Sequence, residues 1–331
     1  MKFLDVLIIG CGSIGALKDY RYDSPDSFNI LTWAHAFRSL SDEYKVNLLF
    51  LDENINKAEQ AQKKWGGRVL TNIDKYYANR NIDLPFIIIV AVPTEQHAVI
   101  LKQIVKYDPD LVIAEKPFCS NLNEALCVSD LYRINLIPIM INYTRKFLPI
   151  INEIKNAIST NKLGDIQFCS LLYNRGFKRE ACHGLNLMNY FFGDFIKGTI
   201  IKQDKILIDY AQNDPTYRAV LSFKECDMIS ITPLDGRQFS IFEIDIIGTK
   251  MRYSLIDHGK TLEIAQVVSE PVYGNYNSLS LTKSIFPTDL TKGLLYAAQN
   301  AINFIECNES LKCTEIDALN VHKIYDQILN D

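Results

Sequence analysis

One stretch near the start of the sequence has a glycine spacing that suits binding of a phosphate-containing ligand. An apolar run, Val6–Ile9, leads directly into Gly10-Cys11-Gly12-Ser13-Ile14-Gly15. Glycines at the spacing G-x-G-x-x-G let the backbone turn tightly and approach a pyrophosphate, which backbone N–H groups then bind. We therefore expect a dinucleotide site that includes Gly10, Gly12, Ser13, Ile14 and Gly15. The alternative is a glycine turn that joins a strand to a helix and binds no ligand.

An acidic residue should follow the second strand of such a site and bind the adenosine ribose hydroxyls. Asp52 follows the predicted strand Val46–Leu51, with Glu53 beside it. Its distance from Gly15 exceeds the roughly 20 residues of a compact motif, and we attribute the excess to the polar, turn-rich segment Tyr20–Asn29. An acid with no adjacent arginine would repel a 2′-phosphate, so the sequence favours NAD, with NADP as the alternative. An acid at a helix N-terminus is the other role open to Asp52.

Another predicted strand, Phe86–Val92, ends in Pro93-Thr94-Glu95-Gln96-His97. This places a turn and a helix N-terminus at the carboxyl end of the strand, which is where ligands bind in such folds. We expect Pro93 and Thr94 to contribute to the cofactor site. His97 either lines the nicotinamide pocket or has a structural role.

A lysine follows the next predicted strand, Leu111–Ala114, in the sequence Glu115-Lys116-Pro117. Beside a nicotinamide ring, Lys116 could donate a proton or polarise a carbonyl during hydride transfer. Glu115 could orient Lys116 and border the cofactor. A surface lysine with no catalytic role is the alternative for Lys116.

The order of the predicted elements indicates how these residues are positioned. The strands named above and Leu136–Ile141 are apolar on both faces, as in a buried parallel sheet. They alternate with helical patterns at 30–40, 55–65, 95–107 and 123–133. This alternation predicts an α/β fold whose N-terminal Rossmann domain, residues 1–120, has a doubly wound parallel sheet.

Residues 121–331 are predicted to form an α+β domain for substrate binding and oligomerisation. Strand-like runs at 166–173, 198–208, 217–223, 228–233, 239–247, 251–256 and 262–268 predict an open, mostly antiparallel sheet. One face of this sheet could build a subunit interface. Helical patterns lie at 150–159, 181–192, 291–306 and 315–329, and the last two could pack back on the first domain.

The composition excludes several classes of protein. The 331 residues have a net charge of -4 and no block rich in lysine or arginine, which argues against a partner such as nucleic acid or a membrane surface. No apolar stretch reaches the roughly 18–20 residues of a membrane span. The eight cysteines are scattered without a Cys-x-x-Cys pair, so we predict no metal site and no disulfide framework, and a cytoplasmic location.

Taken together, these motifs resemble the glucose-fructose oxidoreductase / inositol dehydrogenase (Gfo/Idh/MocA) family. Besides the glycine loop and Glu115-Lys116-Pro117, the similar segments are AVPTEQH at 91–97, NYTRKF at 142–147, KLGDI at 162–166, HGLNLMNYFFG at 183–193, and the helix 298–307 with 313–317. The resemblance implies a bound nicotinamide cofactor and oxidation or reduction at a sugar or cyclitol hydroxyl. It also implies that Lys116 is catalytic, that its peptide bond to Pro117 is cis, and that His183 is an acid/base near the substrate.

The sequence departs from this family at two positions. Many members have an aspartate four residues before the histidine, where this chain has Arg179, and an aspartate is often found three residues after it, where this chain has Asn186. The usual carboxylates are therefore missing, or replaced by Glu180. Candidate substrate-binding residues are Tyr143, Arg145, Lys178, Arg179 and Asn186. The cations among them suit a phosphate or carboxylate, unless they are merely solvated beside the site.

We therefore predict an NAD(P)-dependent oxidoreductase that acts on a sugar, a cyclitol or an anionic nucleotide-sugar, such as those of surface-polysaccharide synthesis. The resemblance suggests a homodimer or homotetramer. Two alternatives remain. One is a dinucleotide-binding sensor with impaired catalysis, suggested by the missing carboxylates, and the other is an NAD-dependent glycosidase on the same scaffold.

Overall fold

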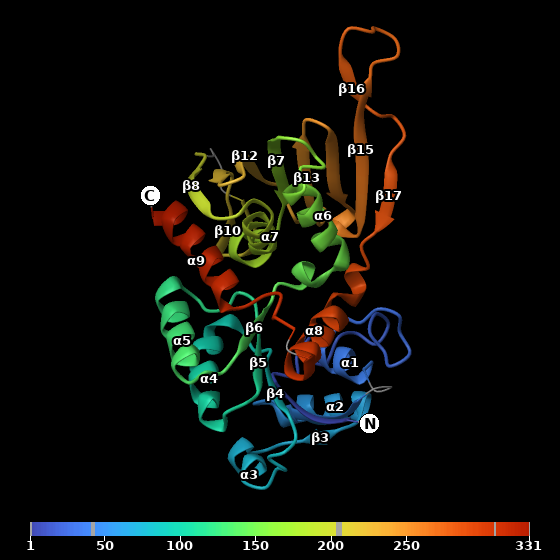
Figure 1. Cartoon of the computed structure of the whole chain (residues 1–331). Helices are drawn as coiled ribbons and strands as arrows, with labels where there is room; N and C mark the ends of the chain where they lie inside the picture. Colours follow the sequence, from blue (N-terminus) through green and yellow to red (C-terminus); the bar gives the residue numbers. More distant parts are fainter. Residues whose placement is uncertain (1, 41–43, 203–206, 308, 331) are drawn as a thin grey trace. The chain divides into compact units, whose positions relative to one another are not determined.

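The computed structural model describes all residues except 1, 41–43, 203–206, 308 and 331 (Figure 1). The chain divides into two compact units. The first contains residues 1–147 and 291–319, and the second contains residues 148–290 and 320–331. Among the described residues, no helix combines the length and the apolar character needed to cross a bilayer.

The first unit is built on a six-stranded parallel sheet with the order β3-β2-β1-β4-β5-β6. Its strands are β1 (Lys2–Ile9), β2 (Tyr44–Leu51), β3 (Arg68–Val69), β4 (Phe86–Val90), β5 (Leu111–Glu115) and β6 (Ile139–Asn142). Every residue of β4 and β5 is buried, as the apolar runs predicted. The sheet confirms the predicted doubly wound α/β domain.

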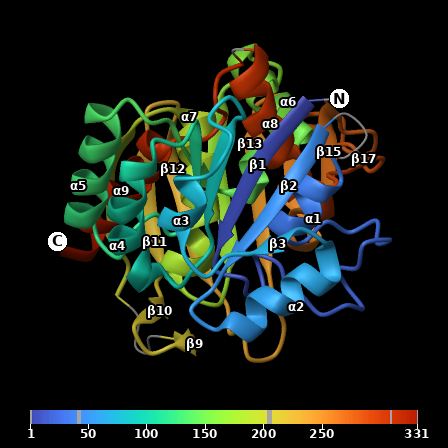
Figure 2. The ribbon, with the colours of Figure 1, turned by 90° about the horizontal axis from the view of Figure 1, so that it is seen from below.

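Helices cover both faces of this sheet (Figures 1 and 2). One face carries α1 (Trp33–Arg38) and α2 (Ile55–Trp65), and the other carries α4 (Thr94–Ile104) and α5 (Leu122–Ile134). The short helix α3 (Ile73–Tyr77) follows β3, and α8 (Gly293–Cys307) packs beside α1. The C-terminal helix α9 (Glu315–Asn330) begins in the first unit and ends in the second.

The predicted strand at 136–141 and the predicted helix at 30–40 both begin later than expected. The strand predicted at 136–141 begins only at Ile139, because Leu136 has a φ of 56° and Pro138 follows it. The helix predicted at 30–40 begins at Trp33, because the Thr32 hydroxyl accepts the N–H of His35 and caps it. The short elements β3 and α3 were not predicted.

The segment before α1 is a loop that interrupts a helix. The N–H of Leu17 bonds to the carbonyl of Gly12, which closes a single helical turn after the glycine loop. The chain then leaves, and at α1 the N–H groups of Trp33 and Ala34 bond to the carbonyls of Ile14 and Gly15 at 3.0 Å each. The loop between them accounts for the long spacing from Gly15 to Asp52, as the sequence suggested.

A buried carboxylate fixes this loop. Asp23 is fully buried and accepts hydrogen bonds from the N–H of Leu31 and the hydroxyl of Thr32, and it lies 2.6 Å from Nδ1 of His35. Burial alone would raise the pKa of the Asp23 carboxyl, but the hydrogen bonds from His35, Thr32 and Leu31 hold it below its ordinary value. The loop is therefore tied to the start of α1.

The second unit contains a mixed sheet with the order β16-β15-β14-β13-β7-β12-β11-β8, in which β17 also pairs with β15. Only β7 and β12 pair in parallel, so the sheet is mostly antiparallel, as predicted. The strands are β7 (Ile166–Tyr173), β8 (Phe195–Ile200), β11 (Ala219–Phe223), β12 (Cys226–Pro233), β13 (Phe242–Gly248), β14 (Met251–Ile256), β15 (Thr261–Ser269), β16 (Asn277–Leu279) and β17 (Ser284–Pro287).

The helices α6 (Pro149–Ser159) and α7 (Cys182–Phe192) lie on one face of this sheet (Figure 1). Alternate residues of β13 and β14 are buried and half-exposed, so the other face is open. A separate hairpin pairs β9 (Leu207–Ala211) with β10 (Asp214–Thr216). The strand predicted at 198–208 corresponds to β8 and the start of β9, and residues 203–206 lie outside the described chain.

Candidate functional site

The predicted cofactor residues gather at one edge of the parallel sheet in the first unit. The glycine loop follows β1, Pro93 and Thr94 follow β4, and Lys116 follows β5. Because β1, β4 and β5 are neighbours and run parallel, their carboxyl ends meet at this edge. This edge is where open α/β sheets bind ligands.

The three glycines of the loop have different surroundings. A Cβ atom on Gly10 would lie 2.5 Å from the carbonyl oxygen of Ala91, and one on Gly15 would lie 2.0 Å from the carbonyl oxygen of Gly10. Gly10 also has a φ of 92°. A Cβ atom on Gly12 would meet no atom within 4 Å. Gly10 and Gly15 are thus required by the fold, whereas Gly12 leaves open space, as close approach of a pyrophosphate requires.

Asp52 is connected to the glycine loop. Its Oδ2 accepts the N–H of Cys11 at 2.7 Å, and its Oδ1 accepts the N–H of Asn54 at 2.9 Å. The first bond holds the acid beside the loop, which is where an adenosine ribose would have to be bound. The second bond reaches Asn54, whose own side chain caps α2, so Asp52 lies just before that helix and does not cap it.

His97 bonds to backbone groups. It is buried, its Nε2 lies 2.9 Å from the carbonyl oxygen of Val92, and its Nδ1 lies 3.2 Å from that of Phe118. Burial lowers the pKa of its imidazole, which favours the neutral ring. His97 therefore links the segments that follow β4 and β5, and this geometry favours the structural alternative.

Glu115 forms the most constrained polar contact at this edge. Its Oε1 accepts hydrogen bonds from the indole N–H of Trp33 and from the amide of Asn142, each at 2.7 Å. Burial raises the pKa of the Glu115 carboxyl above its ordinary value of 4.5, and the bonds from Asn142 and Trp33 oppose that shift. The next residue is the half-buried Lys116, whose peptide bond to Pro117 is cis, as the family resemblance implied.

The candidates Tyr143 and Arg145 follow β6 in the same unit. Glu115 and Asn142 are paired residues of β5 and β6, so Lys116 and Tyr143 leave adjacent strands at the same level. Tyr143 and Arg145 are both buried. The neighbouring Lys146 forms an ion pair with Asp317, which anchors the segment after β6 to the first turn of α9.

The other predicted residues lie on one helical stretch of the second unit. Lys178 and Arg179 belong to a π-helix, Phe177–Ala181, which continues into α7 with His183 and Asn186. Single π turns are rare and are often found at functional sites. His183 is buried, and its ring meets the edge of Phe242 with centroids 6.4 Å apart.

Asn186 has a buried side-chain amide that stands apart in the described part of the chain. Its side chain is 1% exposed, and neither its oxygen nor its nitrogen has a hydrogen-bond partner among the described residues. A buried amide without partners is costly, so it needs a physical reason.

The sequence analysis did not identify several residues that contact the candidate site residues of the first and second units. Trp33 and Asn142 bond to Glu115, and neither was predicted as a site residue. Arg175 and Tyr210 lie beside Arg179. Two signals were available for Asn142, which are its position immediately after a predicted strand and its place at the start of the segment NYTRKF at 142–147. No pattern in the sequence relates Trp33 to Glu115.

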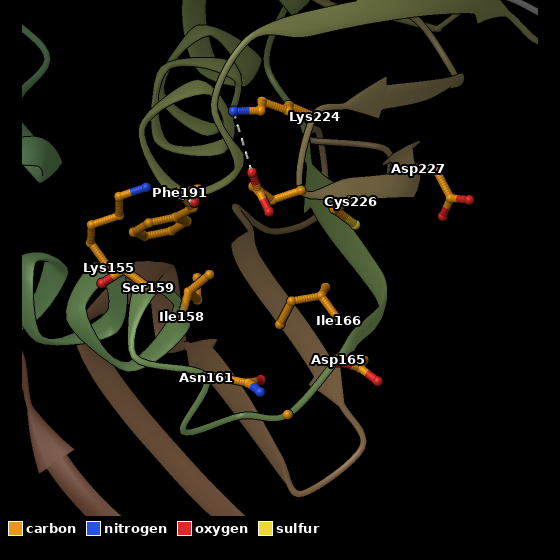
Figure 3. Close-up of a pocket in the computed structure, with 12 residues that line it drawn as sticks. Lys155, Ile158, Ser159, Asn161, Asp165, Ile166, Phe191, Lys224, Cys226 and Asp227 are labelled. Atoms are coloured by element: carbon orange, nitrogen blue, oxygen red, sulfur yellow. Dashed lines mark hydrogen bonds and ion pairs between the residues drawn. The ribbon is translucent and has the colours of Figure 1, made fainter.

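A cavity of about 800 Å³ lies elsewhere in the second unit, among the ends of α6 and α7 and the start of β12 (Figure 3). Lys155, Asp165 and Lys224 are among its lining residues, and none of the predicted site residues is. Lys155 donates to the carbonyl of Phe191, and Lys224 contacts Glu225 at 3.8 Å. In the described part of the chain, no three or more His, Cys, Asp or Glu residues are gathered as a metal site would need.

The environments of the glycines predict opposite effects for two similar substitutions. Gly12→Ala should leave the free energy of unfolding unchanged and weaken NAD binding about tenfold or more, because the methyl group enters the ligand's space. Gly15→Ala should cost about 1–3 kcal/mol of stability through overpacking. Urea denaturation and calorimetric NAD titration of both variants check this. Equal NAD affinity of Gly12→Ala and the wild type would contradict the assignment.

The raised pKa of Glu115 predicts a pH-dependent stability. Between pH 4.5 and the raised pKa, the folded protein retains a proton that the unfolded chain releases, so stability falls as the pH rises through this window. Glu115→Gln keeps an acceptor oxygen and lacks this titration. The stability of the wild type relative to this variant should therefore fall between about pH 5 and about pH 8, by about 1.4 kcal/mol for each unit of pKa shift. Denaturant unfolding of the wild type and Glu115→Gln at both pH values measures this difference, with Glu53→Gln as control. The same change of stability with pH in the wild type and in Glu115→Gln would refute the prediction.

Comparisons with known proteins concern the fold and the first unit. Residues 4–136 match the model of the oxidoreductase family with an NAD-binding Rossmann fold, Gfo/Idh/MocA. No curated protein matches the sequence significantly.

Three similar solved structures cover almost the whole chain. An oxidoreductase from Agrobacterium radiobacter in complex with NAD⁺, L-tartaric acid and magnesium is 14% identical, with 99% of this chain and 95% of that chain covered and a TM-score of 0.71. A UDP-N-acetylglucosamine 3-dehydrogenase from Acidithiobacillus ferrooxidans is 14% identical, with 99% and 97% covered and a TM-score of 0.71. A dehydrogenase from Chromobacterium violaceum is 13% identical, with 100% and 95% covered and a TM-score of 0.75.

At such identities these structures show a shared fold. The family model matches the sequence of the N-terminal part of the chain. The glycine loop, Asp52 and the segment Glu115-Lys116-Pro117 all lie within the matched residues. The similarity in sequence to the Gfo/Idh/MocA oxidoreductase family is therefore to its NAD-binding Rossmann domain, over residues 4–136.

Proposed function

We propose that the protein is an NAD-dependent dehydrogenase or reductase acting on a hydroxyl or ketone of a sugar, a cyclitol or a nucleotide-sugar. The observation that carries this proposal is the position of Lys116, directly after the buried and doubly hydrogen-bonded Glu115, on the sheet edge that also holds the glycine loop. The bound nicotinamide would supply or accept the hydride. Lys116 would transfer the proton of the hydroxyl or carbonyl oxygen, with His183 assisting.

NAD is the preferred cofactor in this proposal. Asp52 accepts the N–H of Cys11, which holds its carboxylate beside the loop and supports our assignment of Asp52 to the adenosine ribose. Pro93 and Thr94 would border the cofactor from the end of β4. Repulsion between Asp52 and the extra phosphate would disfavour NADP.

The buried amide of Asn186 supports a polyhydroxylated substrate. An amide offers both a donor and an acceptor, and a sugar hydroxyl can satisfy either. A ligand hydroxyl would remove the cost of burying this group without partners. Tyr143, Arg145, Lys178 and Arg179 are the other residues that we propose for substrate binding.

An anionic group on the substrate is part of the proposal, because three of these five residues are cationic. The similar oxidoreductase from Agrobacterium radiobacter holds L-tartaric acid, and the dehydrogenase from Acidithiobacillus ferrooxidans is named for a nucleotide-sugar. Tartrate and nucleotide-sugars both carry anionic groups, which supports the choice of substrate class.

We also propose a homodimer or homotetramer formed through the open face of the second sheet, where alternate residues of β13 and β14 are half-exposed. A cytoplasmic location is proposed from the cysteines. None of the seven whose side chains the structure describes is in a disulfide, which suits a reducing compartment.

Cofactor binding gives the first test. Asp52→Ala should weaken NAD binding about tenfold or more, because it removes both the ribose acceptor and the bond that positions Cys11. Its relative affinity for NADP should rise. Calorimetric titration with NAD⁺, NADH, NADP⁺ and NADPH measures this, with the neighbouring Glu53→Ala as control. Unchanged NAD affinity in Asp52→Ala would remove Asp52 from the site.

Turnover tests the role of Lys116. Lys116→Met keeps the length of the side chain and removes the ammonium, so the rate should fall about 10²–10⁴-fold. NADH formation with a panel of sugars, uronic acids and nucleotide-sugars measures the rate, and Lys102→Met, an exposed lysine of α4, is the control. A wild-type rate in Lys116→Met would contradict the assignment. NAD binding without turnover of any compound would favour the sensor alternative.

A further inference from the structure

Three residues missed or only partly explained by the sequence form a cluster in the second unit, which we call the Arg–Tyr cluster: Arg175, Arg179 and Tyr210. Tyr210 belongs to β9, Arg179 to the π-helix, and Arg175 to the turn between β7 and the π-helix. The guanidinium carbon of Arg179 lies 3.6 Å from the centroid of the Tyr210 ring, and that of Arg175 lies 5.5 Å from it. One aromatic ring thus contacts two cations.

The backbone that carries the arginines is strained. Arg175 has a φ of 67° and Gly176 a φ of 97°, so two consecutive residues are in the left-handed region. A non-glycine residue adopts this conformation only where its surroundings impose it, and such strain is concentrated at functional sites. A Cβ atom on Gly176 would lie 2.2 Å from Oδ2 of Asp214, so the turn also admits no larger residue here.

Two carboxylates of the β9–β10 hairpin impose this conformation. Asp209 accepts the N–H of Arg175 at 2.8 Å, and Asp214 accepts the N–H groups of Lys178 and Arg179 at 2.8 and 2.9 Å. These carboxylates therefore bind the backbone N–H groups of the segment that carries the two arginines. The hairpin fixes where both arginine side chains begin and supplies the ring on which they lie.

The charges of the cluster are suited to an external anion. Within the described part of the chain, the guanidinium of Arg175 donates no hydrogen bond and forms no ion pair, and its one described partner is the Tyr210 ring. Burial lowers the pKa of the Arg179 guanidinium, while Glu180, 3.7 Å from its Nε, opposes that shift. A partly dehydrated guanidinium pairs more strongly with an anion than a fully solvated one.

We propose that Arg175 and Arg179 form a subsite for an oxyanion of the substrate, a carboxylate or a phosphate, and that Tyr210 holds the two guanidinium groups in position. This inference rests on the proposed function and adds Arg175 and Tyr210 to its substrate-binding residues. A planar guanidinium can bond to two oxygens of either anion at once. Arg179 begins the helical stretch that continues to His183 and Asn186, so the anion is held by the same stretch as these residues.

Calorimetry on the NAD-loaded protein tests the subsite without requiring turnover. The probes are inorganic phosphate, glucuronate and the neutral sugar glucose. We expect glucuronate or phosphate to bind, and the relative affinities show which anion the subsite accepts. Arg175→Gln and Tyr210→Leu should each weaken anion binding about tenfold or more and leave NAD binding unchanged. Tyr210→Phe keeps the ring and should behave as the wild type, as should Arg133→Gln, which removes an exposed arginine of α5.

The possible outcomes separate this inference from the proposed function. Failure of the wild type to bind NAD would remove the proposed function itself. NAD binding together with no anion binding would overturn the subsite and the anionic group proposed for the substrate, and would leave the dehydrogenase activity intact. Equal anion affinity in Arg175→Gln and the wild type would overturn the subsite alone. Thermal unfolding midpoints show whether each variant is folded. If Arg175→Gln is unfolded, the anion affinity of Tyr210→Leu becomes the test. An anion affinity of Tyr210→Leu equal to that of the wild type would overturn the role of the ring.

Discussion

The first unit depends on one buried carboxylate. Burying Glu115 is costly unless its oxygen is hydrogen-bonded, and the two donors that satisfy it come from Trp33 and Asn142. The backbone N–H of Trp33 also bonds to the carbonyl of Ile14 in the glycine loop. Through Trp33, the loop that would bind a pyrophosphate is therefore coupled to the residue that precedes Lys116. The end of β6 is held by the same carboxylate, so the elements that bear the proposed chemistry cannot shift independently.

The second unit applies the same principle to a helix. Asp209 and Asp214 bond to backbone N–H groups around the π-helix and fix the direction in which the segment enters α7. The buried His183 and the unpartnered amide of Asn186 follow on that helix. In each unit, buried hydrogen bonds thus position a few polar side chains. Burying polar groups is unfavourable, and the burial of apolar side chains in the core offsets it.

Elements with strong local patterns could be predicted from the sequence. The helix Ile55–Trp65 and the strand Ile166–Tyr173 have the predicted boundaries, because apolar periodicity and flanking turn residues determine them locally. The short elements β3, α3, β16 and β17 had too few residues to show a period. The late start of β6 could not be predicted, because the left-handed conformation of Leu136 has no signal in the residue type.

The sequence by itself determined the class of fold, the glycine loop, the acid after the second strand and the lysine after β5, because each of these depends on residues adjacent in the chain. Only the tertiary structure decided which groups distant in the sequence form hydrogen bonds or ring contacts with the site residues. Trp33 meets Glu115 from 82 positions away, and the Tyr210 ring reaches arginines on another element. The loop between Gly15 and α1 and the hairpin β9–β10 bring these partners together. Such contacts depend on which loops bring distant segments together and on the free-energy cost of leaving buried polar groups without hydrogen bonds. Local residue patterns indicate neither.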